Sequence, residues 1–325
     1  MGAPLLQVRG LTTRFRTERG EVTAVDQVSF EADEGETVAI VGESGSGKSV
    51  TALSLLRLIP TPPGRIESGE VLFEGRNLLD LDDAGIRAIR GDKIAMIFQE
   101  PMSSLNPALT IGMQVAEPVR VHRGSPWREA LERARELLER ARIPDAGSRL
   151  TAYPHQFSGG MRQRVMIAMA LACKPRLIIA DEPTTALDVT VQAQILDLLK
   201  ELTVESRSAL ILITHDLGVV ARYADRVIVM YGGRVVETAP ARRLYAHPSH
   251  PYTRGLLASV PRVDGDASVP LVPIEGQPPD LSALPPGCAF APRCRWASER
   301  CRSERPELLP VADRHLKACF ADELD

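Results

Sequence analysis

The sequence contains few aromatic residues, little net charge and no long apolar run. Phe, Trp and Tyr make up 4% of the 325 residues, so an aromatic platform for stacking nucleic-acid bases is not expected. A net charge of −3 gives no basic footprint for nucleic acid. The apolar runs, such as 209–213 and 227–230, have the length of strands, far below the ~20 residues that span a membrane. We therefore predict a protein without a membrane span and without a nucleic-acid partner.

Cysteines and secretory features are also scarce. Four of the five cysteines lie after residue 287, and the N-terminus lacks a basic segment followed by a long apolar core, so no signal peptide is expected. A cytoplasmic chain disfavours disulfides and favours metal ligation or free thiols. Cys173 follows an apolar stretch and is predicted to be a small buried core residue.

A phosphate-binding pattern is present at residues 42–49. Its sequence GESGSGKS fits G-x-x-x-x-G-K-[ST], and it lies between an apolar run at 37–41, a predicted buried strand, and a predicted helix at 49–56. The glycines let backbone N–H groups face phosphate oxygens, and a helix N-terminus favours anions. Lys48 would contact the β- and γ-phosphates and Ser49 would contact Mg²⁺. The predicted nucleotide-binding residues here are Gly42, Glu43, Ser44, Gly45, Ser46, Gly47, Lys48, Ser49 and Val50.

Polar residues also follow three other predicted strands. The run 177–180 ends in Asp181, expected to hold Mg²⁺ through water, and Glu182, expected to be the general base for hydrolysis. Gln99, after the strand at 93–98, is expected to contact Mg²⁺ and the attacking water. His215, after the strand at 209–213, could contact a γ-phosphate. Either Gln99 or His215 alone would be interpreted as ordinary surface, but beside the phosphate pattern they indicate hydrolysis of a nucleoside triphosphate.

Ser158-Gly159-Gly160 forms a second candidate anion site at the start of a predicted helix. Without the pattern at 42–49, an ordinary capped helix would be the better interpretation. One chain does not need two phosphate cradles for one nucleotide, whereas two chains packed head to tail do. We therefore predict that these residues close over the ATP of a partner chain.

The order of apolar segments predicts an α/β fold. Strand-like runs at 177–180, 209–213 and 227–230 alternate with helical patterns, which indicates parallel strands covered on both faces. Short strands are predicted between residues 5 and 41, with turns at Gly20 and at 33–35. Ser125 is predicted to cap a helix with Pro126 at its first position, and the Pro- and Gly-rich stretch 261–286 suggests a linker or an irregular module.

In this order, these motifs resemble the nucleotide-binding subunit of an ABC transporter, over roughly the first 250 residues. The resemblance implies a P-loop ABC-ATPase core at 1–255 with a helical subdomain at about 100–170. It also implies that Phe15 stacks on adenine, that Asp188 belongs to the nucleotide site, and that two subunits sandwich two ATP molecules.

Further segments resemble the oligopeptide/dipeptide importers. They are FQEPMSSLNP at 98–107, YPHQFSGG at 153–160, and the run from His247 through Tyr252 to Cys294. The last run resembles the C-terminal extension of those importers, which we place at 256–325. The related nickel importers share these features and remain an alternative. A soluble ABC ATPase acting on nucleic acid or ribosomes is less favoured, because coiled-coil insertions, tandem cassettes and basic patches are missing. The presence of Glu182 disfavours a regulator without turnover.

The resemblance also implies partners and a location. These are a second ABC ATPase subunit, usually a different chain, two transmembrane permease subunits, and an extracytoplasmic peptide-binding protein. The chain would then lie at the cytoplasmic face of the cell membrane as a peripheral protein. Whether the two ATPase chains are identical stays open.

The four late cysteines are spaced C-x5-C-x6-C-x17-C, as Cys288, Cys294, Cys301 and Cys319. The C-x2-C pair usual in zinc ribbons is missing, and four thiolates with wider spacing fit a [4Fe–4S] cluster somewhat better. The resemblance implies the same cluster, with zinc and unliganded thiols as alternatives. Because these cysteines lie far in sequence from Lys48 and Glu182, we expect a structural role that leaves ATP binding largely unchanged.

Overall fold

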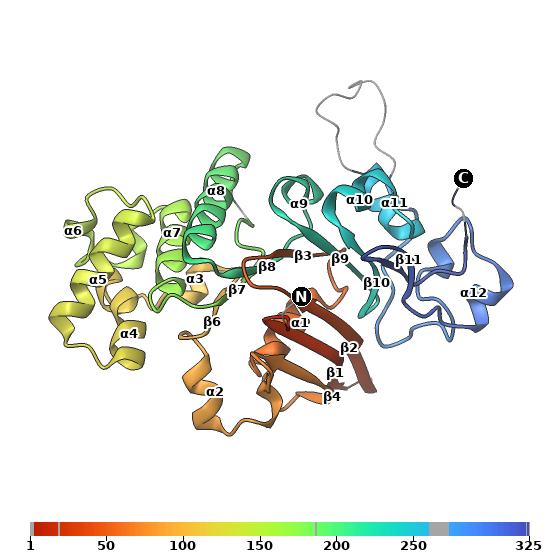
Figure 1. Cartoon of the computed structure of the whole chain (residues 1–325), viewed down its shortest axis with the longest axis horizontal. Coiled ribbons are helices and arrows are strands. Elements are labelled where there is room, and N and C mark those ends of the chain that lie inside the picture. Colours follow the sequence, from red (N-terminus) through yellow and green to blue (C-terminus); the bar gives the residue numbers. More distant parts are fainter. Residues whose placement is uncertain (1–2, 19, 186, 260–272, 323, 325) are drawn as a thin grey trace. The chain divides into compact units, whose positions relative to one another are not determined.

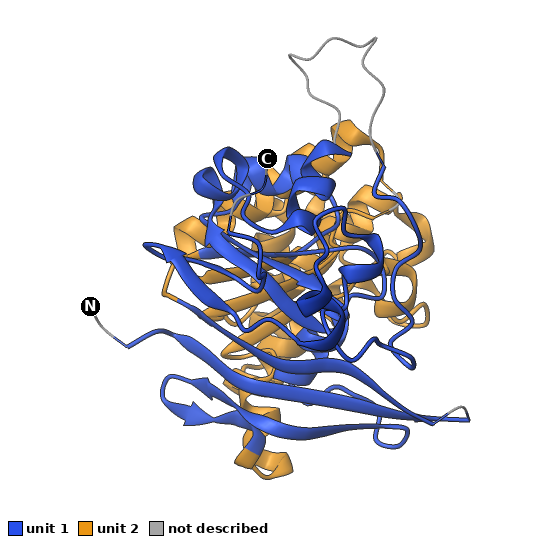
Figure 2. Ribbon diagram, turned by 90° about the vertical axis from the view of Figure 1, so that its right-hand side faces the viewer, with its two compact units in different colours: residues 1–32, 37–79, 213–325 blue, residues 33–36, 80–212 orange. Residues whose placement is uncertain are grey.

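The computed structural model describes residues 3–18, 20–185, 187–259, 273–322 and 324. They form two compact units, coloured separately in Figure 2: unit 1 comprises 1–32, 37–79 and 213–325, and unit 2 comprises 33–36 and 80–212. Each unit is described by itself. Among the described residues, no helix has the length and apolar character needed to cross a membrane.

Unit 1 contains an antiparallel four-stranded sheet in the order β2-β1-β4-β5 (Figure 1). Its strands are β1 (Leu6–Thr17), β2 (Gly20–Ala32), β4 (Gly64–Phe73) and β5 (Arg76–Asn77). The strands predicted for this region are therefore too short. Register shifts in the β1–β2 pairing, between Val8 and Leu11 and again before Thr13, mark bulges. Such bulges interrupt the apolar alternation without ending the strand.

The second sheet portion of unit 1 runs in the order β11-β12-β10-β9-β3. Strands β3 and β9 are parallel, and the other pairs are antiparallel. The C-terminal residues thus extend the sheet that contains the strand preceding 42–49. The strands are β3 (Thr37–Val41), β9 (Arg226–Tyr231), β10 (Arg234–Pro240), β11 (Leu309–Ala312) and β12 (His315–Lys317). The α-helices of unit 1 are α1 (Lys48–Leu55), α9 (Leu217–Tyr223), α10 (Ala241–Ala246), α11 (Pro251–Ala258) and α12 (Glu299–Ser303).

The C-terminal segment shares its core with the rest of unit 1. Tyr252 and Phe290 belong to the same buried cluster as Val41 and Tyr231, and Cys294 packs against it. The rings of Tyr231 and Phe290 meet edge to face with centroids 5.2 Å apart, a favourable geometry for aromatic pairs. Part of the stretch expected to be a linker, 261–272, lies outside the described residues.

Unit 2 combines strands in the order β8-β7-β6 with a group of helices, drawn yellow to green in Figure 1. All residues of β7 and β8 are buried, as the continuous apolar runs at 177–180 and 209–213 predict. The helix expected to be capped by Ser125 is instead preceded by Pro126 at the cap position, without a side-chain cap. The elements are β6 (Ile94–Ile97), β7 (Leu177–Asp181), β8 (Ala209–Ile213), α2 (Asp83–Ile89), α3 (Pro101–Ser104), α4 (Ile111–Arg123), α5 (Trp127–Arg140), α6 (Ala146–Arg149), α7 (Gly159–Ala170) and α8 (Val189–Ser206).

Candidate functional site

In unit 1, residues 42–47 form a tight turn after β3, and Lys48 and Ser49 begin α1. Gly45 and Gly47 have φ angles of 79° and 99°, in the left-handed region that favours glycine. A Cβ at Gly42 would overlap the carbonyl oxygen of Met230, and one at Gly47 would overlap that of Ala24. The close approach of neighbouring backbone therefore requires glycine at Gly42 and Gly47, the two glycines of the pattern.

The polar groups of this turn fit a phosphate ligand. Lys48 is buried, and its Nζ donates to the carbonyl oxygens of Gly42 at 2.8 Å and Glu43 at 3.0 Å. The Oγ of Ser46, which is 4% exposed, has no hydrogen-bond partner among the described residues. A buried hydroxyl without a hydrogen-bond partner destabilises the fold. A bound phosphate would supply that partner, because its oxygens can accept a hydrogen bond from the Ser46 hydroxyl.

Glu43 also has contacts that the sequence did not predict. Its carboxylate accepts two hydrogen bonds from Arg293, at 2.7 and 3.1 Å, and its backbone N–H donates to the Tyr252 hydroxyl at 2.7 Å. Both partners come from the C-terminal part of unit 1. Sequence reasoning missed them because 250 residues separate Glu43 from Arg293.

Phe15 and His215 also lie in unit 1. Phe15 is partly buried on β1, and a Cβ added at Gly64 of the paired strand would lie 2.8 Å from its ring. His215 is exposed just before α9. The roles predicted for both side chains stay predictions.

In unit 2, the carboxylate of Glu182 receives two hydrogen bonds. Gln99 Nε2 donates to it at 3.1 Å and Thr185 Oγ1 at 2.9 Å. The structure therefore brings Glu182, the predicted base, together with Gln99, and adds Thr185. Thr185 lies only three positions after Glu182, so their closeness in sequence could have suggested this hydrogen bond. Glu182 has a φ of 44°, an uncommon backbone conformation that clusters at functional sites. Asp181, before it, is 5% exposed.

The remaining predicted residues of unit 2 lie at the starts of two helices: Ser158, Gly159 and Gly160 at α7, and Asp188 at α8. Ser158 caps α7, its Oγ accepting from the Met161 N–H at 3.4 Å, and Gly159 beside it is exposed. Asp188 caps α8 by accepting from the Val191 N–H at 2.9 Å. These capping bonds explain both residue types locally, so their roles toward nucleotide stay predictions.

The four late cysteines line one small cavity of about 20 Å³, together with aromatic residues including Phe290 and Trp296. Burial raises the pKa of the Cys288 and Cys319 thiols and raises the pKa of Cys294 to about 11. Among the described residues, no three His, Cys, Asp or Glu side chains are arranged to hold a metal ion. The four cysteines line the same cavity, but their side chains are not arranged to hold a metal ion, and the metal stays a prediction. Cys173 is buried, as expected.

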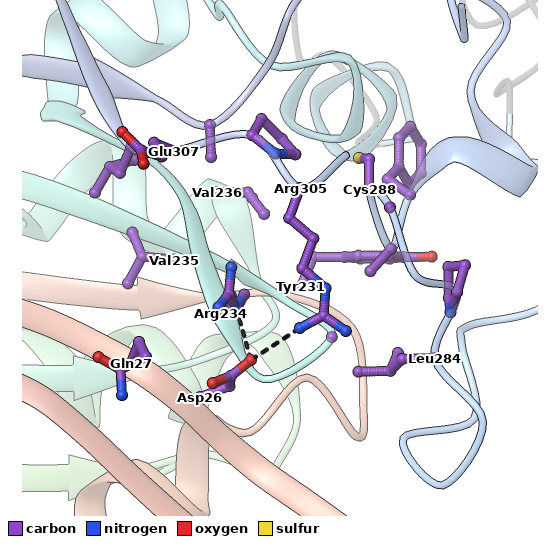
Figure 3. A pocket seen from close by; sticks show the side chains of 18 of the residues that line it. Asp26, Gln27, Tyr231, Arg234, Val235, Val236, Leu284, Cys288, Arg305 and Glu307 are labelled. Atoms are coloured by element: carbon purple, nitrogen blue, oxygen red, sulfur yellow. Dashed lines mark hydrogen bonds and ion pairs between the residues drawn. The ribbon is translucent and has the colours of Figure 1, made fainter. Parts of the chain in front are cut away.

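A larger cavity, of about 670 Å³, lies between β2, β10 and the C-terminal segment (Figure 3). At one side, Asp26 accepts from Arg234 at 2.8 Å and from Arg305 at 3.3 Å. The residues of the turn at 42–49 do not line this cavity. This cavity therefore lies where the C-terminal segment packs on β2 and β10, separate from the phosphate turn.

Known proteins resemble this chain over nearly its whole length. A protein of Brucella melitensis biotype 1 named for peptide import and ATP binding is 53% identical, covering 98% of this chain and 97% of that protein. The oligopeptide transport ATP-binding protein OppD of Haemophilus influenzae is 50% identical, with the same coverage. The dimeric post-hydrolysis structure of the ATP-binding cassette MJ0796 bound to ADP and Pi is similar, with a TM-score of 0.66 and 34% identity. It covers 73% of this chain and 99% of that one.

Two family models match successive parts of the chain. Residues 25–185 match the ABC transporter family, and residues 236–301 match the C-terminal region of oligopeptide/dipeptide transporters. The predicted resemblance and the predicted cassette fold are confirmed. The chain belongs to the ABC transporter family, in the group that carries the oligopeptide/dipeptide transporter C-terminal region.

Proposed function

We propose that this chain binds and hydrolyses ATP to power the import of peptides through a membrane transporter. The observation that carries the proposal is the presence of the oligopeptide/dipeptide C-terminal region on a chain with a formed phosphate turn. The relatives named for peptide import and oligopeptide transport support the same substrate class.

Each predicted residue takes a role in this proposal. Glu182 is the general base, held by Gln99 and Thr185. Lys48, with the N–H groups of the turn, binds the phosphates. Mg²⁺, which neutralises phosphate charge when bound, would be held by Ser49, Gln99 and Asp181, whose oxygen atoms suit this hard cation. The remaining roles are adenine stacking by Phe15, a γ-phosphate contact by His215, and nucleotide-site contributions from Val50 and Asp188.

The proposed assembly pairs this chain with a second ABC ATPase subunit, two permease subunits and an extracytoplasmic peptide-binding protein, at the cytoplasmic face of the membrane. Ser158, Gly159 and Gly160 would close over the partner's ATP. The similar MJ0796 cassette is dimeric in its structure with ADP and Pi, which supports pairing. The partner chain is proposed to be different from this one.

The domain division proposed from the sequence is a nucleotide-binding domain at 1–255 with a helical subdomain at about 100–170, followed by an extension at 256–325. The group of helices α3 to α7 supports the subdomain. Phe290 of the extension belongs to the same buried cluster as residues of β3 and β9, so the extension depends on the core for its packing.

The experiment that tests the function is peptide uptake in a strain lacking this chain. Restoration by the wild-type gene is expected for dipeptides or oligopeptides, with none by the Lys48→Ala variant at equal protein level. Restoration of nickel uptake alone would favour the nickel-importer alternative. Co-purification of nucleic acid or ribosomes instead of permease subunits would favour the soluble ATPase.

We also propose that Cys288, Cys294, Cys301 and Cys319 hold a [4Fe–4S] cluster. Their shared cavity supports convergence of the four thiols. The spacing lacks the C-x2-C pair usual around zinc, and four cysteine thiolates are the ligand set that would hold a [4Fe–4S] cluster. The cavity is small, and among the described residues no three of these side chains are arranged to hold a metal ion, so the segment would have to rearrange to admit the cluster.

Anaerobically purified protein is therefore expected to be brown and to contain iron and sulfide. Serine at any of the four positions should remove the colour, whereas Cys173→Ser, at a buried cysteine outside this group, should keep it. If the protein contained stoichiometric zinc and no iron, the four cysteines would be assigned to a zinc site. A protein without metal would reject both.

A further inference from the structure

Two residues of the C-terminal part of unit 1 hold the second residue of the phosphate turn. The backbone N–H of Glu43 donates to Tyr252, its carboxylate accepts from Arg293, and its carbonyl oxygen accepts from Lys48. Every polar group of Glu43 is thus used. Two of these contacts come from outside the turn, and the third joins Glu43 to the lysine that binds phosphate.

The ion pair between Arg293 and Glu43 is largely shielded from solvent. The Arg293 side chain is 5% exposed and that of Glu43 is 26% exposed. The pair is bidentate, the arrangement in which arginine binds carboxylates most specifically. The hydrogen bond to Glu43 also raises the pKa of Arg293 above its ordinary value.

Arg293 is itself held by the C-terminal segment. Its Nε donates to the Glu275 carbonyl at 2.9 Å, and Nη2 donates to the Ile274 carbonyl at 3.3 Å. It ends a short 3₁₀ turn, Ala291–Arg293, directly before Cys294, and the Cys294 N–H donates to the Ala291 carbonyl at 3.3 Å. The fold of the cysteine-lined segment therefore fixes the position of this guanidinium.

Glu43 carries a negative charge in a turn whose ligand is also an anion. Without a cation beside it, this carboxylate would repel the phosphates, more strongly in a partly buried site than in water. We propose that Arg293 is a positioning residue that neutralises and anchors Glu43, so that the cysteine-bearing segment controls the ATP affinity of the phosphate turn. This inference rests on the proposed function only in that the turn binds ATP. It assigns the cysteine-bearing segment an effect on ATP affinity, where the sequence led us to expect a structural role only.

The test is a double-mutant cycle on ATP affinity, measured by calorimetry on the full chain with Mg²⁺ and ATP. Arg293→Ala should weaken ATP binding about tenfold, because it leaves the Glu43 carboxylate uncompensated. In a Glu43→Gln background the same substitution should change affinity less than about twofold, because the charge that Arg293 neutralises has been removed.

The matched control is Arg305→Ala, which removes another arginine that joins the C-terminal segment to the core, through Asp26 at 3.3 Å (Figure 3). It should leave ATP affinity within about twofold, since Asp26 lies outside the phosphate turn.

Cys294→Ser should weaken ATP binding as Arg293→Ala does, because it disturbs the segment that holds Arg293. Increased proteolysis of the segment around 288–301 is the second readout.

Three results would overturn the inference. They are unchanged affinity in Arg293→Ala, equal loss in the presence and absence of the Glu43 charge, and equal loss in Arg305→Ala. The last two would indicate a general effect of detaching the segment. A wild-type chain that binds no ATP would instead overturn the proposed function, so the two failures are distinguishable.

Discussion

The turn at 42–49 and the helix start at 158–160 are both glycine-bearing helix N-termini, yet they are built differently. In the first, Ser46 and Lys48 are at most 5% exposed, and Cβ atoms added at Gly42 and Gly47 would overlap neighbouring backbone. In the second, Ser158 and Gly159 are exposed, and the atom nearest to a Cβ at Gly159 would be 3.5 Å away. A Cβ at Gly160 would lie 2.9 Å from the Val191 side chain, and not against backbone. The first is a formed cradle, whereas the second is an open surface that another molecule could cover.

This contrast supports different tasks for the two helix starts. A cradle enclosed by its own unit can bind a phosphate group without a partner. An exposed capped helix start offers backbone N–H groups and a favourable dipole. Here Gly159 also lines an open cavity together with Gln99, Arg162 and Thr185. The following variants separate binding, closure and hydrolysis.

The largest effect is expected for Glu182→Gln, which leaves both helix starts intact. Turnover of ATP in the assembled transporter should fall by ~10² or more, because the general base is lost. ATP binding should persist and the closed two-subunit state should accumulate, as measured by size-exclusion chromatography with ATP. Turnover close to wild type would remove Glu182 from the role of base.

An intermediate effect is expected for Lys48→Ala, which damages the formed cradle alone. Hydrogen bonds to charged groups contribute roughly 1.5–3 kcal/mol, so ATP affinity of the isolated chain should fall ~10–100-fold. Calorimetry on the isolated chain measures it. Thermal unfolding without nucleotide serves as the control for folding, and wild-type affinity in a folded variant would contradict the assignment.

The smallest effect on the isolated chain is expected for Ser158→Ala, which alters the open helix start. Loss of the cap on α7 costs about 1 kcal/mol of stability, and ATP affinity should stay within about twofold. Pairing with the partner ATPase in the presence of ATP should be impaired. If Ser158→Ala and Lys48→Ala weakened ATP binding by the isolated chain equally, the division of tasks would be wrong.

The sequence by itself determined the parts whose chemistry is local. Residues 42–49 are neighbours on one turn, so their spacing defines the cradle, and Glu182 directly follows the predicted strand that became β7. Buried strands such as β8 were predictable because their apolar runs are continuous. The long strands β1 and β2 were not, since bulges disturb the alternation that marks a strand.

Only the tertiary structure decided which distant residues meet. The four cysteines could be counted in the sequence, but their convergence on one cavity depends on how the segment folds. The pairing of Arg293 with Glu43 depends on packing of Phe290 and Tyr252 into the cluster that includes Val41 of β3. Sequence distance suggested that the C-terminal segment is independent of the phosphate turn. Contacts between residues far apart in sequence follow from the packing of a common core, and no local pattern encodes them.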